Sequence, residues 1–80
     1  MLYHLTGMDK PETINDLKEY ESEKKSLSPQ QHLAMKNFDR YRYVILTNTK
    51  GEIEFQREFQ RLQSLANLSS YEEFLKDEYL

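Results

Sequence analysis

Between residues 55 and 66, apolar side chains recur at the spacing of an α-helix. Phe55, Phe59, Leu62 and Ala66 stand at positions i, i+4, i+7 and i+11, which places all four on one side of a helix. Glutamine and arginine take most of the other positions. The segment therefore predicts an amphipathic helix that has to pack its apolar side against another element.

Three further helices are indicated by residues that cap helix N-termini. Each site has an aspartate or serine with a glutamate or glutamine three residues later, in the sequences Asp9-Lys10-Pro11-Glu12, Ser28-Pro29-Gln30-Gln31 and Ser70-Tyr71-Glu72-Glu73. The side-chain oxygen of such a cap accepts a hydrogen bond from an amide that the first helical turn leaves free. We expect helices over residues 10–25, from residue 28 onward, and over residues 70–79.

Residues 41–56 fit two different structures. The stretch 41–47 consists almost entirely of strand-favouring residues, Gly51 can supply a positive φ in a turn, and residues 52–55 alternate polar and apolar. These features favour a β-hairpin near 41–56, with residues 2–5 as a third strand. In the alternative, the helix from Ser28 continues through Ile45 and a new helix starts at Thr49. The predicted fold class is thus α+β, helix-rich, in one small domain over residues 1–80, with an all-α helical bundle as the alternative.

The same stretch resembles part of a known family. Residues 44–53, followed by Phe59, Leu62 and residues 70–74, resemble the opening hairpin and helices of PAS sensor domains. The resemblance covers less than half of the chain and does not assign it to that family. It implies the hairpin at 44–53 and no ligand.

The residue types argue against most catalytic and metal sites. The chain has no cysteine, two glycines and two histidines, so thiolate chemistry and glycine-rich phosphate loops are excluded. His4 and His32 are not spaced as a metal-binding pair on one helix. We therefore expect no enzyme, no cofactor and no metal site. The apolar runs are too short to span a membrane or to form a signal peptide, so we expect no membrane partner and a cytoplasmic location.

The centre of the chain is basic although the whole chain carries a net charge of −3. Residues 36–61 contain six Lys or Arg and four Asp or Glu. Arginine and tyrosine alternate over residues 40–43, and such mixtures bind single-stranded nucleic acids through phosphate contacts and base stacking. A nucleic-acid-binding regulator that uses segment 36–61 is therefore one hypothesis. It is weakened by the acidic chain and by the alternation, which on a strand separates tyrosines from arginines.

Protein binding is the hypothesis that the composition favours. Six tyrosines and four phenylalanines are many for so small a core, and Tyr and Arg are enriched at protein interfaces. We expect Phe55, Phe59, Leu62 and Phe74 in the core. The candidate partner-binding residues are Arg40, Tyr41, Arg42, Tyr43, Arg57, Arg61, Tyr71 and Tyr79. The predicted function is that of a small regulatory or accessory protein (an inhibitor, adaptor or assembly factor of bacterial or phage type) that binds another protein and can form a homodimer.

Overall fold

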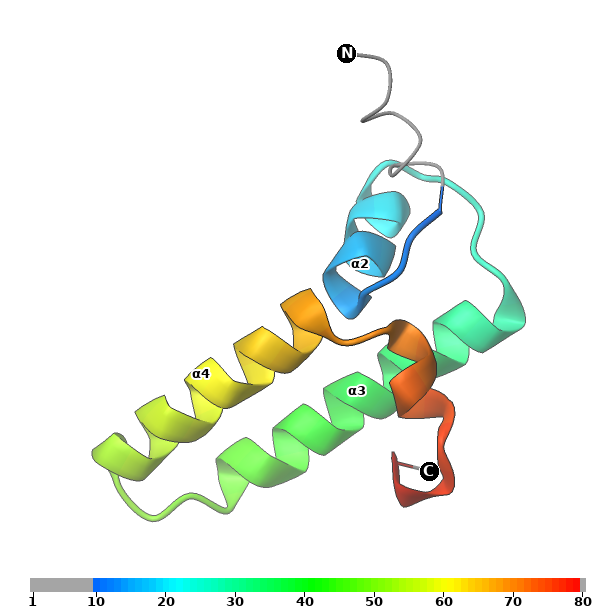
Figure 1. The fold of residues 1–80 in the computed structure, drawn as a ribbon. Helices are drawn as coiled ribbons and strands as arrows, with labels where there is room; N and C mark the ends of the chain where they lie inside the picture. The colour runs from blue at the N-terminus through cyan, green and yellow to red at the C-terminus, as the bar shows by residue number, and fades with distance from the viewer. Residues whose placement is uncertain (1–9, 80) are drawn as a thin grey trace.

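The computed structural model describes residues 10–79. Three α-helices, α2 (Ile14–Ser22), α3 (Pro29–Thr47) and α4 (Glu52–Leu68), precede two short 3₁₀-helices, η1 (Tyr71–Leu75) and η2 (Asp77–Tyr79). Helices α3 and α4 form an antiparallel hairpin, with α2 and the C-terminal segment packed at the end away from its loop (Figure 1). No strand occurs within residues 10–79. The described chain is all-α.

The predicted β-hairpin at 41–56 is therefore wrong, and the α+β fold class with it. Residues 41–47 form the last two turns of α3, and residues 52–55 form the first turn of α4. The hairpin implied by the PAS resemblance is likewise helical. Only the turn is where it was expected, at residues 48–51. The proposed third strand at 2–5 lies outside the described residues.

Side chains at the end of α3 explain why the helix continues through strand-favouring residues. The Thr47 hydroxyl donates to the Tyr43 carbonyl oxygen (2.8 Å), Asn48 Nδ2 donates to that of Val44 (2.9 Å), and the Thr49 hydroxyl donates to that of Leu46 (2.9 Å). The carbonyl groups of Val44 and Leu46 are among the last four of the helix, which a helix end leaves without an intrahelical partner. The propensity cost of residues such as Val and Tyr in a helix is only a fraction of a kcal/mol each, so capping and packing outweigh it.

The turn chemistry also differs from the prediction. Gly51 has φ −177° and ψ 169°, an extended conformation, and is the N-cap of α4. Its backbone does not adopt the positive φ expected for a hairpin turn. The Glu54 carboxylate accepts a hydrogen bond from the Lys50 amide (3.0 Å), so a helix-start contact replaces the predicted β-turn.

The predicted helix starts are confirmed in part. Ser28 caps α3, with a reciprocal bond from Gln31. Helix α2 is shorter than expected because its cap is Thr13, paired with Asp16, and Asp9 lies outside the described residues. Ser70 accepts from the amide of Glu72, two residues on, and the predicted helix over 70–79 consists of η1 and η2.

The hydrophobic core lies at the end of the α3–α4 hairpin where α2 and η1 pack. Its buried apolar residues come from all four elements, namely Ile14, Leu17, Ala34, Met35, Phe38, Leu62, Ala66 and Phe74. Phe74 is fully buried, and its ring meets that of Phe38 edge-on at 5.0 Å between centroids. Core positions predicted at Leu62 and Phe74 are confirmed. Phe59 is half-buried and Phe55 is exposed, so the prediction for Phe55 is wrong.

Polar contacts fix the outer elements on the hairpin. Asn37 is buried, and its side-chain amide donates to the Phe74 carbonyl oxygen (2.8 Å). The Tyr71 amide donates to the Glu12 carbonyl oxygen (2.7 Å), which ties η1 to the segment before α2. Lys18 of α2 forms an ion pair with Asp39 of α3 (3.1 Å). These contacts hold α2 and the C-terminal segment against one half of the hairpin.

Replacing Phe74 by alanine tests the position of the core. Because Phe74→Ala leaves a cavity among α3, η1 and η2, we expect the free energy of unfolding to fall by about 3–5 kcal/mol, measured by urea denaturation. Leu68→Ala is the control, since Leu68 is 81% exposed and a surface change costs less than about 0.5 kcal/mol. Equal losses in the two variants would contradict this core.

Candidate functional site

The half of the hairpin beyond the core carries the candidate site. We call residues 39–61, the distal part of α3, the loop and the first half of α4, the distal arm. None of these residues is buried. At the base of the arm Asp39 contacts α2 and Tyr41 contacts η2, and beyond that base the hairpin extends past both (Figure 1). The molecule is accordingly elongated, at 45 × 28 × 20 Å.

The distal arm is rich in large apolar side chains despite its exposure. The buried core contains eight apolar residues. The arm carries the same number of large apolar residues, namely Tyr41, Tyr43, Val44, Ile45, Leu46, Ile53, Phe55 and Phe59. Ile53 is 79% exposed, Tyr43 68%, Val44 47% and Phe55 37%. Two helices side by side cannot cover all of their own apolar surface, so the arm presents apolar groups to solvent on several sides.

A network of aromatic and guanidinium groups forms the base of the arm. The rings of Tyr41 and Tyr79 meet edge-on at 4.9 Å between centroids. Arg61 lies over the Tyr41 ring, with 6.0 Å from Cζ to the centroid, and forms an ion pair with Glu58 at 2.8 Å. Hydrogen bonds to Tyr41 and Glu58 raise the pKa of Arg61 above its ordinary value. These contacts stabilise the junction between α3, α4 and η2.

Arg40 belongs to the same junction. One of its terminal nitrogens, Nη2, lies 3.0 Å from Asn37 Oδ1 and 3.0 Å from the Tyr79 carbonyl oxygen, and donates to both. The side chain therefore bridges the buried amide of Asn37 to the end of η2. Among the described residues Arg40 has no carboxylate partner, yet its guanidinium is engaged by neutral acceptors.

On the side of the hairpin that α2 partly covers, the arm has a second cluster. Arg42 is half-buried with Cζ 5.9 Å from the centroid of Phe59, and the rings of Phe55 and Phe59 are stacked at 6.2 Å. Leu46 follows Arg42 by one helical turn. A small notch lined by Lys18 of α2 and Arg42, among others, marks where the cover by α2 ends.

Because residues 40–43 are helical, their alternating arginines and tyrosines are not sorted onto two faces as they would be on a strand. Consecutive helical residues point about 100° apart, so the four side chains radiate in different directions and do not form the two faces of a strand. Arg40 and Tyr41 contact η2, Arg42 contacts Phe59, and Tyr43 is exposed. The structure thus brings Arg40, Tyr41, Arg61 and Tyr79 together and leaves Arg57 and Tyr43 outside that group.

Sequence reasoning named Tyr43 as a candidate but missed the exposed apolar residues Val44 and Ile53 of the arm. Ile53 lies two positions before Phe55 and is therefore on the opposite side of α4 from the Phe55–Ala66 stripe. An apolar residue out of phase with its helix stripe was the available signal. It was hidden because the hairpin interpretation placed Ile53 and Phe55 together on one face of a strand.

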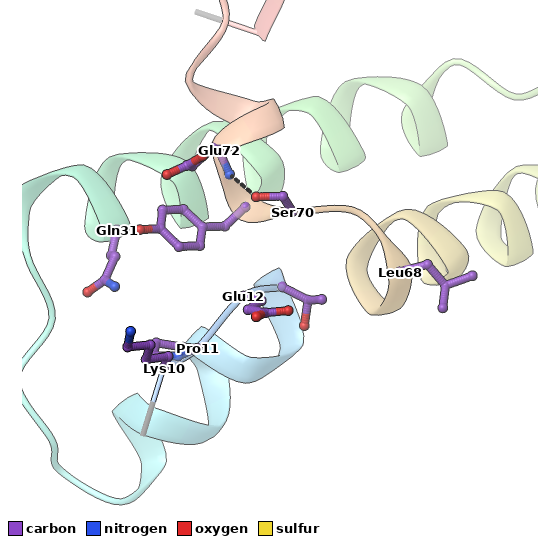
Figure 2. Close-up of a pocket in the computed structure, with 9 residues that line it drawn as sticks. Lys10, Pro11, Glu12, Gln31, Leu68, Ser70 and Glu72 are labelled. Atoms are coloured by element: carbon purple, nitrogen blue, oxygen red, sulfur yellow. Dashed lines mark hydrogen bonds between the residues drawn. The ribbon is translucent and has the colours of Figure 1, made fainter. Parts of the chain in front are cut away.

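Tyr71, the remaining predicted residue, lies away from the arm. It lines an open groove of about 690 Å³ with Lys10, Pro11, Glu12, Leu68 and Glu72, among others (Figure 2). The groove carries an amine, carboxylates and hydroxyls, and Ser70 already accepts a bond from the Glu72 amide (Figure 2). No buried side-chain polar atom in the described part of the chain lacks a hydrogen-bond partner. The groove can offer polar contacts but holds no histidine to activate a nucleophile.

The described residues contain no cluster that could hold a metal ion. Among residues 10–79, no three side chains of the His, Cys, Asp and Glu types converge. His32 is exposed in the first turn of α3, and His4 lies outside the described residues. None of the helices described is at once long and apolar enough to cross a bilayer.

Comparison with known proteins does not assign the chain to a family. No protein-family model matches the chain, and no curated protein sequence and no solved structure matches it. The functional conclusion therefore rests on the distal arm itself.

The environment of Tyr79, at the base of the arm, leads us to expect a loss of stability at alkaline pH. Burial, and then the charge of Glu78, raise the pKa of Tyr79 above its ordinary value. Because the folded state keeps this proton longer than the unfolded chain does, the stabilisation is present below about pH 10 and is lost as the pH rises through the folded-state pKa. We expect Tyr79→Phe to weaken this decline in urea denaturation between about pH 8 and 11. Tyr43→Phe, at an exposed ring, should leave the decline unchanged, and an equal effect of both variants would contradict the assignment.

Proposed function

We propose that this protein is a small non-catalytic binding module whose distal arm contacts another protein. The observation that carries the proposal is that residues 39–61 contain eight large apolar side chains and no buried residue. Four of them, Tyr43, Val44, Ile53 and Phe55, are exposed, and large apolar side chains exposed on one part of a molecule are typical of protein interaction sites. The tyrosines and arginines of the arm belong to the residue types enriched at interface hot spots.

The shape of the arm supports binding over catalysis. A catalytic site needs a concave pocket that excludes water and positions a reacting group. The arm is a pair of helices that ends in a four-residue loop, and the notches that Arg40 and Arg42 line at its base are small and open. Such a surface can lie against a second folded surface but cannot enclose a small substrate.

The arginines of the arm also distinguish protein binding from nucleic-acid binding. Arg40 and Arg61 bond to groups at the arm base, and Arg42 lies over Phe59. Of the arm cations, only Lys50 and Arg57 make no side-chain hydrogen bond, ion pair or ring contact among the described residues, and Glu52 and Glu54 lie close to them in sequence. Phosphate binding requires several free cations on one surface, so the arm suits a protein partner better.

Salt dependence tests the nucleic-acid alternative. We expect no saturable binding of a labelled single-stranded oligonucleotide at about 0.15 M salt, where exposed charges are screened beyond roughly 8 Å, measured by fluorescence anisotropy. Affinity that rises steeply at low salt and is lost in the Arg40→Ala/Arg42→Ala variant would contradict the protein-binding proposal and favour a regulator that uses segment 36–61.

A matched pair of double variants tests the arm itself. Ile53→Lys/Phe55→Lys places charges on two exposed apolar positions of the arm, 79% and 37% exposed. The control, Leu33→Lys/Leu68→Lys, changes two positions off the arm that are 42% and 81% exposed. We expect tagged wild-type protein and the control to retain the same stoichiometric protein from nuclease-treated lysate of the source organism. The arm variant should lose it while keeping its helical circular dichroism and cooperative unfolding.

Two results would contradict the proposal. In the first, the arm variant and the control retain the captured protein equally, which would place binding elsewhere. In the second, folded wild-type protein captures no stoichiometric partner in the nuclease-treated lysate, and partners return only when nuclease is omitted.

A further inference from the structure

The arm has one face that is complementary to itself. We call Arg42, Leu46, Glu52, Phe55 and Phe59 the arm face. Arg42 lies over Phe59, Leu46 follows Arg42 by four residues, and Glu52 and Phe55 precede Phe59 by seven and four residues. Residues separated by three, four or seven positions share one side of a helix, so the five side chains line one side of the α3–α4 hairpin.

The charges of this face form no ion pair within the described chain. Arg42 makes no ion pair among residues 10–79, although Asp39 is three residues away, because Asp39 pairs with Lys18. Glu52 likewise makes no ion pair among these residues. The other two carboxylates of α4 within the arm already have partners, since Glu54 accepts a hydrogen bond from the Lys50 amide and Glu58 forms an ion pair with Arg61.

The two charges without an ion pair stand at opposite ends of the face. Arg42 lies beside Phe59, and Glu52 is seven residues from Phe59, which corresponds to about 10 Å along the helix axis. The half-buried or exposed apolar groups Leu46, Phe55 and Phe59 occupy the length between them. From the base of the arm to its tip, the face therefore presents a cation, an apolar centre and a carboxylate.

We propose that the occupant of this face is a second copy of the chain, bound about a two-fold axis with the two arms antiparallel. A two-fold interface brings the same patch of both subunits together. With the axis near Phe55, Arg42 of each copy meets Glu52 of the other, and the apolar centres pack between the two ion pairs. The inference rests on the proposed function of the arm and names its partner.

The fold supplies the boundaries of such an interface. Helix α2 covers the same side of the hairpin up to Lys18 and Asp39, so the tip of one arm would end against α2 of the other copy. The contact is short, and interfaces at the small end of the size range are typically transient. We therefore expect dissociation constants in the micromolar range.

Charge reversal tests the pairing directly, by sedimentation equilibrium over a range of protein concentrations. Arg42→Glu and Glu52→Arg each create two like-charge contacts per dimer, so we expect each variant alone to dimerise at least roughly tenfold more weakly than wild type. In an equimolar mixture of the two variants, both contacts become opposite-charge pairs again. The mixture should regain wild-type dimerisation as a heterodimer.

Arg57→Glu is the matched control. Arg57 is exposed on α4 within the arm, has no ion pair among the described residues, and lies off the arm face because it is two positions from Phe59 and Phe55. The variant changes the net charge as much as Arg42→Glu does, and we expect it to dimerise like wild type. An equal loss in both arginine variants would overturn the pairing.

Other outcomes overturn the inference without touching the proposed function. A wild-type protein that stays monomeric to high micromolar concentration, or a dimer whose variants are not rescued on mixing, rejects the second copy at this face. If the lysate experiment then still shows a partner lost in Ile53→Lys/Phe55→Lys, the arm binds a different protein. If that experiment also fails, the proposed function fails with it.

Discussion

The buried amide of Asn37 holds the C-terminal segment against α3. Its donor bonds to the Phe74 carbonyl oxygen and its acceptor receives a bond from Arg40, which also reaches the Tyr79 carbonyl oxygen. A buried amide left without such partners would cost free energy comparable to the hydrogen bonds themselves. The arrangement thus fixes where η1 and η2 lie and brings the Phe74 ring into contact with Phe38.

The position of Phe74 limits the extent of the core. Buried apolar residues on the hairpin lie no further along it than Phe38 on α3 and Leu62 on α4. A chain of this size can bury only about 60% of the surface that its unfolded form exposes, and α2 and η1 are short. The helices of the hairpin are longer than the elements available to cover them, and the distal arm is the uncovered remainder.

This uncovered length connects the fold to its proposed function. The arm keeps its helical form through the caps at Thr47, Asn48 and Thr49 and through stacked aromatic rings. Part of its surface is covered by the protein itself, where Arg61 and Tyr79 contact the Tyr41 ring. The side that carries Arg42, Phe55 and Glu52 is not used in this way. A second folded surface against that side would complete the layer that α2 begins.

The sequence by itself determined the helix starts and the periodic stripes. The cap at Ser28 with Gln31 follows from local hydrogen bonding, and the alignment of Phe55, Phe59, Leu62 and Ala66 on one side of a helix follows from their spacing; neither needs a distant partner. It also pointed to residues 40–61, where six of the eight candidate binding residues lie. The tertiary structure alone decided whether residues 41–56 are strand or helix, because their propensities nearly balance and the packing of Tyr41 and Ile45 against the core settles the difference. It likewise decided that Phe55 is exposed while Leu62 is buried, since both occupy the same stripe and only the limited reach of α2 and η1 separates them.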